Sequence, residues 1–224
     1  MKKLLLFVTC LTLVSFAIAQ NTKNQTCERI THFGKATICL PAVEGMKECY
    51  NDNIVKQIAD GTEVKTNMVL GYYLTNADYN KRNTPEDMQM EEYFKVYSVK
   101  KLQDYTATAN DLEKMESAVE QSFAKDNWEE IVKKVETDYD SISIGVPTMI
   151  EKYKLDKSSV TYILLVKYSA GNKEDLKLLV MNLLFLKEKL VSLGFYKTYK
   201  NEQSLQATKI KNDSIINKFI AANR

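Results

Sequence analysis

Glycine, proline and histidine are scarce in this 224-residue sequence. It contains seven glycines, three prolines and a single histidine, His32. So few glycines and prolines exclude a low-complexity linker, and no internal repeat is visible. The length therefore fits one domain with a short extension.

Motifs that carry catalysis or bind a cofactor are also missing. No GxSxG, Walker-type or GxGxxG sequence occurs. A structural zinc site needs about four ligands, whereas residues 20–224 offer only Cys27, Cys39, Cys49 and His32, without a CxxC or HExxH pattern. His32 lacks a sequence context that would orient it as a base, so we interpret it as a surface residue. We predict no catalytic, cofactor-binding or metal-binding residues and no cofactor.

A long apolar run occurs only at the N-terminus. Two lysines precede an apolar segment, residues 4–16, and Ala17 and Ala19 then place small residues where a signal peptidase recognises them. The run is short for a membrane span and is interrupted by hydroxyl residues. We predict a signal peptide at residues 1–19, cleaved before Gln20. The product is expected to be extracytoplasmic, either periplasmic or secreted, with no membrane span after cleavage.

Neither sign of charge is in large excess. The chain has 31 Lys and Arg and 29 Asp and Glu residues. Because residues 1–19 contain two lysines and no acidic residue, the chain that remains after cleavage has 29 of each. A nucleic-acid-binding protein usually shows a basic excess or stripe. We therefore expect a mixed, solvated surface and no nucleic-acid partner.

Apolar periodicity predicts both strands and helices in the first two thirds of the chain. Strands are predicted at 35–41, 64–75 and 93–101, and helices at 52–61, 84–87, 110–119 and 126–135. Alternation from Val64 to Tyr72 places every second residue on one strand face. Asp52 is expected to cap the first helix, and Gly61 to end it in a left-handed turn. Asn110 and Glu113 resemble the capping box of the third.

The C-terminal third predicts an antiparallel meander and a closing helix. Three strand candidates, 159–169, 175–187 and 189–199, are separated by short turns. The stretch 178–186, LLVMNLLFL, is apolar on both faces and so predicts a central strand covered on both sides. The last segment, 201–222, presents one apolar side, formed by Leu205, Ile215, Ile216, Phe219 and Ile220.

These elements predict an α+β fold, an antiparallel sheet with a C-terminal meander, flanked by helices as an α/β/α sandwich. Residues 20–34 are polar and lack a clear apolar pattern, so we expect a flexible N-terminal arm. Residues 35–224 are then a single α+β domain.

Two further groups of side chains have a functional and a structural interpretation. Tyrosines in or beside the predicted strands either line a ligand-binding face or pack in the sheet, and we favour packing because tyrosine is common in strands. The acidic group Glu86, Asp87, Glu91 and Glu92 lacks the spacing of a calcium loop and is interpreted as a solvated helical face. The tyrosines are Tyr72, Tyr73, Tyr93, Tyr97, Tyr162, Tyr168, Tyr196 and Tyr199.

The strand and turn CLPAVEGM, the helical middle and the final meander with its helix resemble an uncharacterised family of bacterial secreted proteins. Their layout is similar to the PsbP-type extrinsic proteins of photosystem II, a fold shared with a small regulator of nuclear import that binds Ran. The resemblance covers residues 35–222 in layout. It implies a PsbP-like α/β/α fold and a non-enzymatic binding or assembly module.

The stretch ICLPAVEGMKECY, residues 38–50, contains two cysteines that lie symmetrically about Glu44. If this stretch folds as a hairpin, Cys39 and Cys49 oppose each other at a Cα separation of about 4.5 Å, which a disulfide accepts. An exported protein also passes through an oxidising space. We predict a structural disulfide between Cys39 and Cys49, which leaves Cys27 unpaired or as an alternative partner.

Two functional hypotheses follow from these patterns. The first is a secreted or periplasmic, non-catalytic binding or assembly module with an unknown protein or small-molecule partner. The alternative is an extracytoplasmic hydrolase with an unrecognised carboxylate or Cys-His site. We favour the binding module, because a chain of this size shows no nucleophile set, metal cluster or phosphate loop.

Overall fold

The described chain forms one large antiparallel sheet and a separate hairpin. The structure is a computed structural model, and it describes residues 27–123, 142–170 and 173–224. The hairpin pairs β1 (Cys27–Phe33) with β2 (Ala36–Pro41). The eight-stranded sheet contains β3 (Met46–Glu48), β4 (Asn67–Thr75), β5 (Glu92–Val99), β6 (Ile142–Ile144), β7 (Thr148–Tyr153), β8 (Ser159–Ala170), β9 (Lys173–Leu186) and β10 (Lys189–Thr198).

The order of strands across the sheet is β3-β4-β5-β10-β9-β8-β6, and β7 also pairs with β8. All of these pairs are antiparallel. The helices are α1 (Asn53–Gly61), α2 (Asn76–Asn80), α3 (Ala109–Ser122) and α5 (Glu202–Ala222), with short 3₁₀ segments at η1 (Pro85–Asp87) and η2 (Lys100–Leu102).

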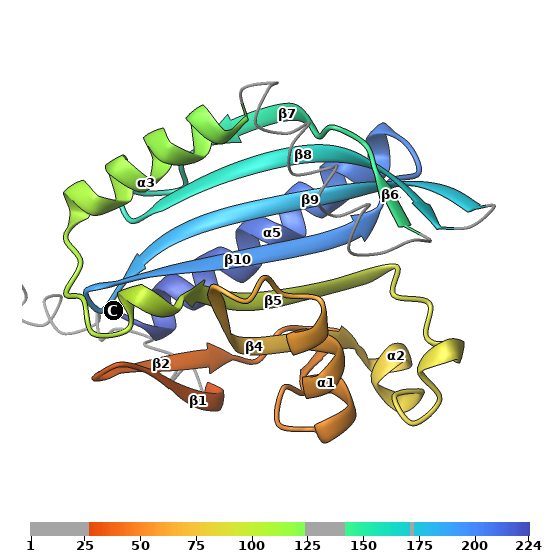
Figure 1. The fold of residues 1–224 in the computed structure, drawn as a ribbon, viewed down its shortest axis with the longest axis horizontal. Coiled ribbons are helices and arrows are strands. Elements are labelled where there is room, and N and C mark those ends of the chain that lie inside the picture. The colour runs from red at the N-terminus through yellow and green to blue at the C-terminus, as the bar shows by residue number, and fades with distance from the viewer. Residues whose placement is uncertain (1–26, 124–141, 171–172) are drawn as a thin grey trace, which may run out of the picture.

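Helices cover both faces of the sheet, so the molecule has three layers (Figure 1). On one face, α5 and the hairpin enclose the main core, in which Phe33 and Leu40 meet Phe94 of β5 and Phe219 of α5. On the other face, α1 packs over β4 and α3 packs over β8 and β9, in two separate apolar clusters. The predicted α+β class, with helices flanking an antiparallel sheet, is confirmed.

The C-terminal meander is also confirmed. Strands β8, β9 and β10 are consecutive neighbours, and Lys187 and Glu188 form the turn between β9 and β10 with φ angles of 46° and 60°. Along β9, Leu184 belongs to the core beneath α5, whereas Leu183 belongs to the cluster beneath α3. The apolar run therefore marks a central strand covered on both sides, as predicted.

The alternation predicted for β4 fails in the middle of the strand. A bulge between Val69 and Gly71 shifts the register against β5, so Leu70 faces the main core while Tyr72 faces α1. Val64 lies before the strand and is 61% exposed. A bulge adds one residue on one strand, which reverses the faces of all residues after it.

The helix ends follow local sequence signals with two exceptions. Asp52 caps α1 by accepting hydrogen bonds from the backbone N–H groups of Ile54 and Val55, as predicted. The predicted left-handed ending at Gly61 is wrong. Gly61 is the last residue of the helix but does not have a positive φ, and the capping residue after it, Thr62, has a φ of −98°.

The capping box of α3 lies two residues before the predicted Asn110 and Glu113 pair. There the Thr108 backbone N–H and hydroxyl both donate to Asp111. The apolar stripe of this helix was predicted correctly. Its start was misplaced because the sequence offers two possible capping pairs, Thr108 with Asp111 and Asn110 with Glu113, and the first of them caps the helix.

The predicted flexible arm at 20–34 is wrong for residues 27–33. These residues form β1, and Phe33 at its end is fully buried in the main core. The signal peptide, the cleavage site before Gln20, the start of the arm and the helix predicted at 126–135 lie outside the described residues.

Candidate functional site

The disulfide joins Cys27 to Cys39, so the predicted Cys39–Cys49 pair is wrong. The Cα atoms of the bonded cysteines are 5.3 Å apart across the β1–β2 hairpin. After Pro41 the chain does not return along β2. It turns at Gly45 into β3, which pairs with β4 and carries Cys49 to the edge of the large sheet.

Cys49 is a buried thiol, and its surroundings suppress its reactivity. Its Sγ lies 3.4 Å from the carbonyl oxygen of Tyr72, to which it donates. Burial raises the pKa of Cys49 to about 12, so the neutral thiol prevails at ordinary pH. His32, the other half of the Cys-His alternative, is exposed on β1 opposite Thr37. The structure therefore brings together Cys27 and Cys39 but gives neither His32 nor Cys49 a nucleophilic role.

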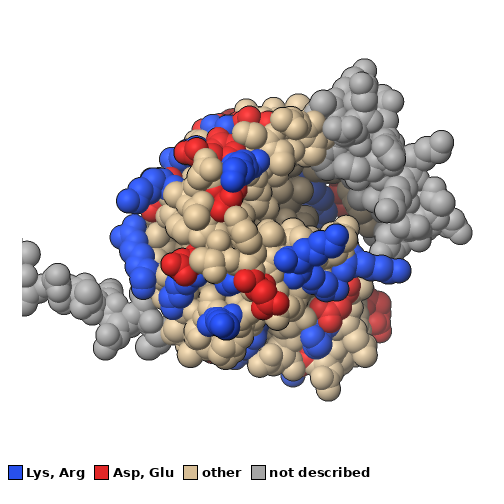
Figure 2. All heavy atoms as spheres, turned by 60° about the vertical axis from the view of Figure 1, so that its left-hand side comes forward, with Lys and Arg blue, Asp and Glu red and all other residues tan. Residues whose placement is uncertain are grey.

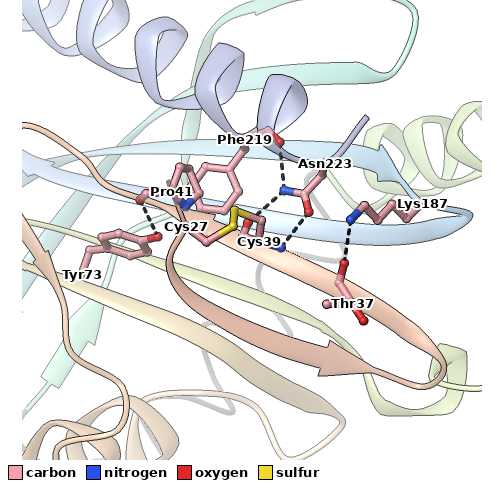
Figure 3. The surroundings of a disulfide bond; sticks show 8 residues. All are labelled: Cys27, Thr37, Cys39, Pro41, Tyr73, Lys187, Phe219 and Asn223. Atoms are coloured by element: carbon pink, nitrogen blue, oxygen red, sulfur yellow. Dashed lines mark hydrogen bonds between the residues drawn. A yellow bond between two sulfur atoms is a disulfide. The ribbon is translucent and has the colours of Figure 1, made fainter. Parts of the chain in front are cut away.

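Asn223, the residue that caps the C-terminal end of α5, holds the disulfide strand in place (Figure 3). The side-chain amide of Asn223 accepts a hydrogen bond from the Cys39 N–H at 2.8 Å and donates one to the Cys39 carbonyl at 2.9 Å. It also donates to the Phe219 carbonyl within its own helix. Because Asn223 is only 2% exposed, these bonds satisfy backbone groups that water does not reach.

Three tyrosines stack across neighbouring strands on the α1 and α3 face of the sheet. The rings of Tyr72 and Tyr93 are 5.6 Å apart, and those of Tyr93 and Tyr196 are 4.7 Å apart. Beside them, the Lys95 ammonium pairs with Glu63 at 2.6 Å, and both side chains are 8% exposed. Burial raises the pKa of each stacked tyrosine, so their hydroxyls remain protonated. Close ring packing supports the structural interpretation of these residues.

A cleft with a volume of about 550 Å³, lined mostly by residues with charged or hydroxyl groups, lies where α2, β5, β10 and the start of α5 meet. We call it the lysine cleft. Sequence reasoning missed it, because its residues come from two stretches far apart in the chain, 75–92 and 197–204. The lining includes three lysines (Lys81, Lys197, Lys200), three acidic residues (Asp78, Glu91, Glu92) and three hydroxyl residues (Thr75, Thr198, Ser204).

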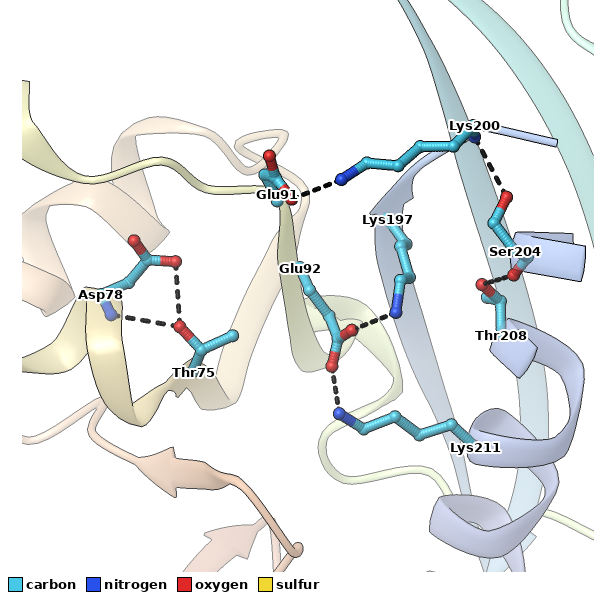
Figure 4. Close-up of polar contacts among 9 residues, drawn as sticks. All are labelled: Thr75, Asp78, Glu91, Glu92, Lys197, Lys200, Ser204, Thr208 and Lys211. Carbon is cyan, nitrogen blue, oxygen red and sulfur yellow. Dashed lines mark hydrogen bonds and ion pairs between the residues drawn. The ribbon is translucent and has the colours of Figure 1, made fainter.

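Glu92 is the centre of the charged groups in this cleft (Figure 4). One carboxylate oxygen binds the Lys197 ammonium at 2.6 Å, and the other binds the ammonium of Lys211 on α5. Burial alone would raise the pKa of Glu92, but the two lysines outweigh it and hold the pKa below its ordinary value. Glu92 therefore stays ionised at neutral pH, and it does not supply the proton that a general acid would donate.

The interpretation of the acidic group as one helical face was incorrect. Glu86 and Asp87 are exposed in η1, whereas Glu92 begins β5 and its side chain is 12% exposed. Glu91 pairs with Lys200 at 3.2 Å where both side chains remain mostly exposed. The sequence signal for the cleft was the pair Glu91 and Glu92 at the start of the aromatic strand β5. This pair does not indicate which lysines contact the two carboxylates.

Asp78 is the most buried acid of the cleft, with 4% of its surface exposed. Its carboxylate accepts hydrogen bonds from the Thr75 hydroxyl at 3.1 Å and from the Gln89 N–H at 2.9 Å. These bonds tie α2 to the segment before β5. Asp78 therefore shapes one wall of the cleft.

Basic and acidic side chains are interspersed over the face drawn in Figure 2, in agreement with the expected mixed surface. Within the described residues, no three His, Cys, Asp or Glu side chains gather closely enough to hold a metal ion. No helix in this part of the chain is long and apolar enough to cross a membrane.

Comparison with known proteins yields little similarity. No protein-family model matches the chain, and no curated protein sequence matches it. Among solved structures, the Ran-binding protein Mog1p of Saccharomyces cerevisiae is similar to it with a TM-score of 0.34 and 12% sequence identity, over 82% of this chain and 86% of that one. A similarity this low indicates no function for this chain.

Proposed function

We propose that this protein is an exported, non-catalytic binding module and that the lysine cleft is its ligand-binding site. The observation that carries the proposal is the cleft itself. Ammonium, carboxylate and hydroxyl groups converge there in a volume suited to a small polar ligand.

The proposed location is supported by two features of the chain. The N-terminal sequence has the lysines, apolar run and small residues of a signal peptide. The Cys27–Cys39 disulfide is the kind of bond that persists in oxidising compartments and is rare in the cytosol.

The absence of catalysis is proposed from the state of the cleft's own groups. Its lining contains neither a cysteine nor a histidine. A hydrolase that used paired carboxylates would keep one of them protonated, with a raised pKa. Glu92 has a lowered pKa, and Glu91 is paired with Lys200. The hydrolase alternative therefore receives less support than the binding module.

Export is tested by expressing the full chain and analysing the extracytoplasmic protein by mass spectrometry. We expect an N-terminus at Gln20 and one disulfide, between Cys27 and Cys39. An extracytoplasmic protein that still begins at Met1 would contradict the predicted cleavage.

Binding is tested by amide NMR of the exported protein, titrated with an anionic, a neutral sugar and a cationic probe: citrate, maltotriose and trilysine. One probe is expected to give saturable shifts at Ala77, Thr198 and Ser204, which lie in the cleft. The same spectra report any conversion of the probe. Turnover of a probe that Glu92→Gln abolishes, or no saturable shift at the cleft with any probe, would contradict the proposal.

A further inference from the structure

We infer that the lysine cleft recognises a small polyanion, a molecule that carries two or more carboxylate or phosphate groups. This inference rests on the proposed function and specifies the ligand of the same site. Three observations lead to it: the local balance of charge, the two lysines that share Glu92, and the weakly held Lys200 at the mouth.

The charge balance around the cleft favours an anion. Its lining carries three lysines and three acidic residues. Two further lysines, not themselves in the lining, contact these residues: Lys211 binds Glu92, and Lys177 donates to the Thr198 hydroxyl at 2.7 Å. The group as a whole therefore has an excess of two positive charges, although the chain after residue 19 has equal numbers of basic and acidic residues.

The Lys197–Glu92–Lys211 arrangement is where the first anionic group would bind. Two ammonium groups share a single carboxylate, which leaves one positive charge without a counter-charge. A lysine ammonium has three N–H donors, so each can bind Glu92 and still donate to a ligand. The side chain of Lys197 lines the cleft and is 29% exposed, and that of Lys211, on the other oxygen of Glu92, is 32% exposed.

Lys200 would bind the second anionic group. It pairs with Glu91 at 3.2 Å, and the two side chains are 62% and 57% exposed. An ion pair this exposed contributes little to stability, so a ligand anion can replace Glu91 at small cost. Figure 4 shows Lys200 and Lys197 on the same side of the cleft, between β5 and α5.

Two neighbouring groups complement the lysines. The Thr198 hydroxyl accepts from Lys177, so its own hydrogen is available to donate. Ser204 of the first turn of α5 lines the cleft, and the N-terminal end of a helix favours negative charge.

The inference is tested by titration calorimetry of the exported protein with citrate and with pyrophosphate. We expect saturable binding of at least one, weakened about tenfold by Lys197→Gln and by Lys211→Gln, because each change removes charge-assisted hydrogen bonds. Binding of citrate alone assigns a carboxylate ligand, and binding of pyrophosphate alone assigns a phosphate ligand. Lys218→Gln, on the same helix α5 but neither in the cleft lining nor paired with Glu92, is the matched control and should retain full affinity.

Glu91→Gln provides a test in the opposite direction. Removing the carboxylate that competes for Lys200 should tighten binding of the anion. Glu113→Gln changes the net charge of the protein by the same amount, at an exposed position on α3, and should not tighten binding. A melting curve of each variant shows whether it is folded.

Three results would overturn the inference. They are equal affinity for Lys197→Gln and the parent, equal tightening by Glu91→Gln and Glu113→Gln, and cleft binding of maltotriose or trilysine but of neither anion. The last result would leave the proposed function intact. Failure of every probe at the cleft would reject both.

Discussion

At the residue scale, the three cysteines after the N-terminal segment differ in role because of where the backbone places them. Cys27 and Cys39 face each other across a hairpin, whereas Cys49 is enclosed beneath β4 with Val55 and Tyr72. The same side-chain type therefore gives a cross-link in one place and a small apolar residue in another.

The thiol chemistry yields the first prediction. Non-reducing peptide mapping should recover a Cys27–Cys39 peptide, and Cys49 should resist alkylation until the protein is unfolded. Cys27→Ser should lower the free energy of unfolding by about 3 kcal/mol, because the bond closes a short loop, of sequence separation 12. A Cys39–Cys49 peptide, or rapid alkylation of native Cys49, would contradict this assignment.

Lys189 is a second residue whose environment determines its role. It is only 6% exposed, and its ammonium donates to the carbonyls of Gln103 at 2.8 Å and Tyr105 at 2.6 Å. The hairpin turn lies against the same carbonyl, since a Cβ on Gly34 would come within 1.9 Å of the Gln103 oxygen. Lys189 and Gly34 together join β10, the hairpin and the segment after η2.

Lys189→Met keeps most of the buried stem and removes the ammonium. It should lower the free energy of unfolding by about 2–3 kcal/mol, because two part-buried hydrogen bonds from a charged donor are lost. Lys187→Met is the matched control. Lys187 donates to the Thr37 carbonyl from an exposed position, so its loss should cost less than about 1 kcal/mol. Equal effects in urea unfolding would show that burial of Lys189 is not decisive.

At the scale of elements, α5 is held on the sheet by polar contacts as well as by its apolar side. Asn212 exchanges hydrogen bonds of 2.9 and 3.1 Å with Asn182 of β9, and Asn182 also accepts from Thr161 of β8. Asn212 is 1% exposed. Residues 212–214, Asn-Asp-Ser, match the sequence of an N-glycosylation acceptor site. Because the Asn212 side chain is buried, the fold keeps this site inaccessible.

Asn223 provides the test of how the end of α5 is anchored. Asn223→Ala removes both hydrogen bonds to Cys39 and leaves a buried N–H and a buried carbonyl without that partner. The free energy of unfolding should fall by about 2–3 kcal/mol in chemical denaturation. Asn217→Ala, at an exposed position on the same helix, should change it by less than about 0.5 kcal/mol. A neutral Asn223→Ala would show that the apolar side of α5 alone anchors it.

At the scale of the whole molecule, carboxylates held by partners determine how stability responds to acid. The pKa values of five acidic side chains are lowered: Asp52 by Arg82, Asp111 by Lys114 and Thr108, Asp156 by Ser158, Glu92 by Lys197 and Lys211, and Glu116 by Lys152 and Lys154. For Asp156, Glu92 and Glu116, these contacts outweigh burial, which acts in the opposite direction. The ion pairs of Asp52, Glu92 and Glu116 tie together segments that are distant in the chain.

A lowered folded-state pKa fixes the sign of the pH dependence. The stabilisation is present above the ordinary carboxyl pKa, which is 4.5 for Glu92, and is lost as the pH falls through the lower folded value. The melting temperature should therefore be level near neutral pH and fall below about pH 4.5. Glu92→Gln should reduce the fall in melting temperature at acidic pH. Glu113→Gln, at an exposed position on α3, should not reduce it. An identical pH profile for Glu92→Gln and the parent would contradict the role given to Glu92.

The parts of this structure that the sequence determined by itself are those that depend on near neighbours. Asp52 lies two and three residues from the amides that it caps. The apolar residues on both faces of β9 indicate that this strand lies in the interior of the sheet. The apolar side of α5 repeats at helical spacing. Such signals are local, so they can be read without knowing the rest of the fold.

Tertiary structure alone decided the disulfide partner and the lysine cleft. Cys39 is ten residues from Cys49 and twelve from Cys27, so sequence distance does not identify its partner. Cys49 lies away from Cys39 because β3, which precedes it, pairs with β4. Glu92 meets Lys197 and Lys211 because β5 lies beside β10 and beneath α5. Contacts between distant segments depend on strand order and register, which nearby residues do not encode.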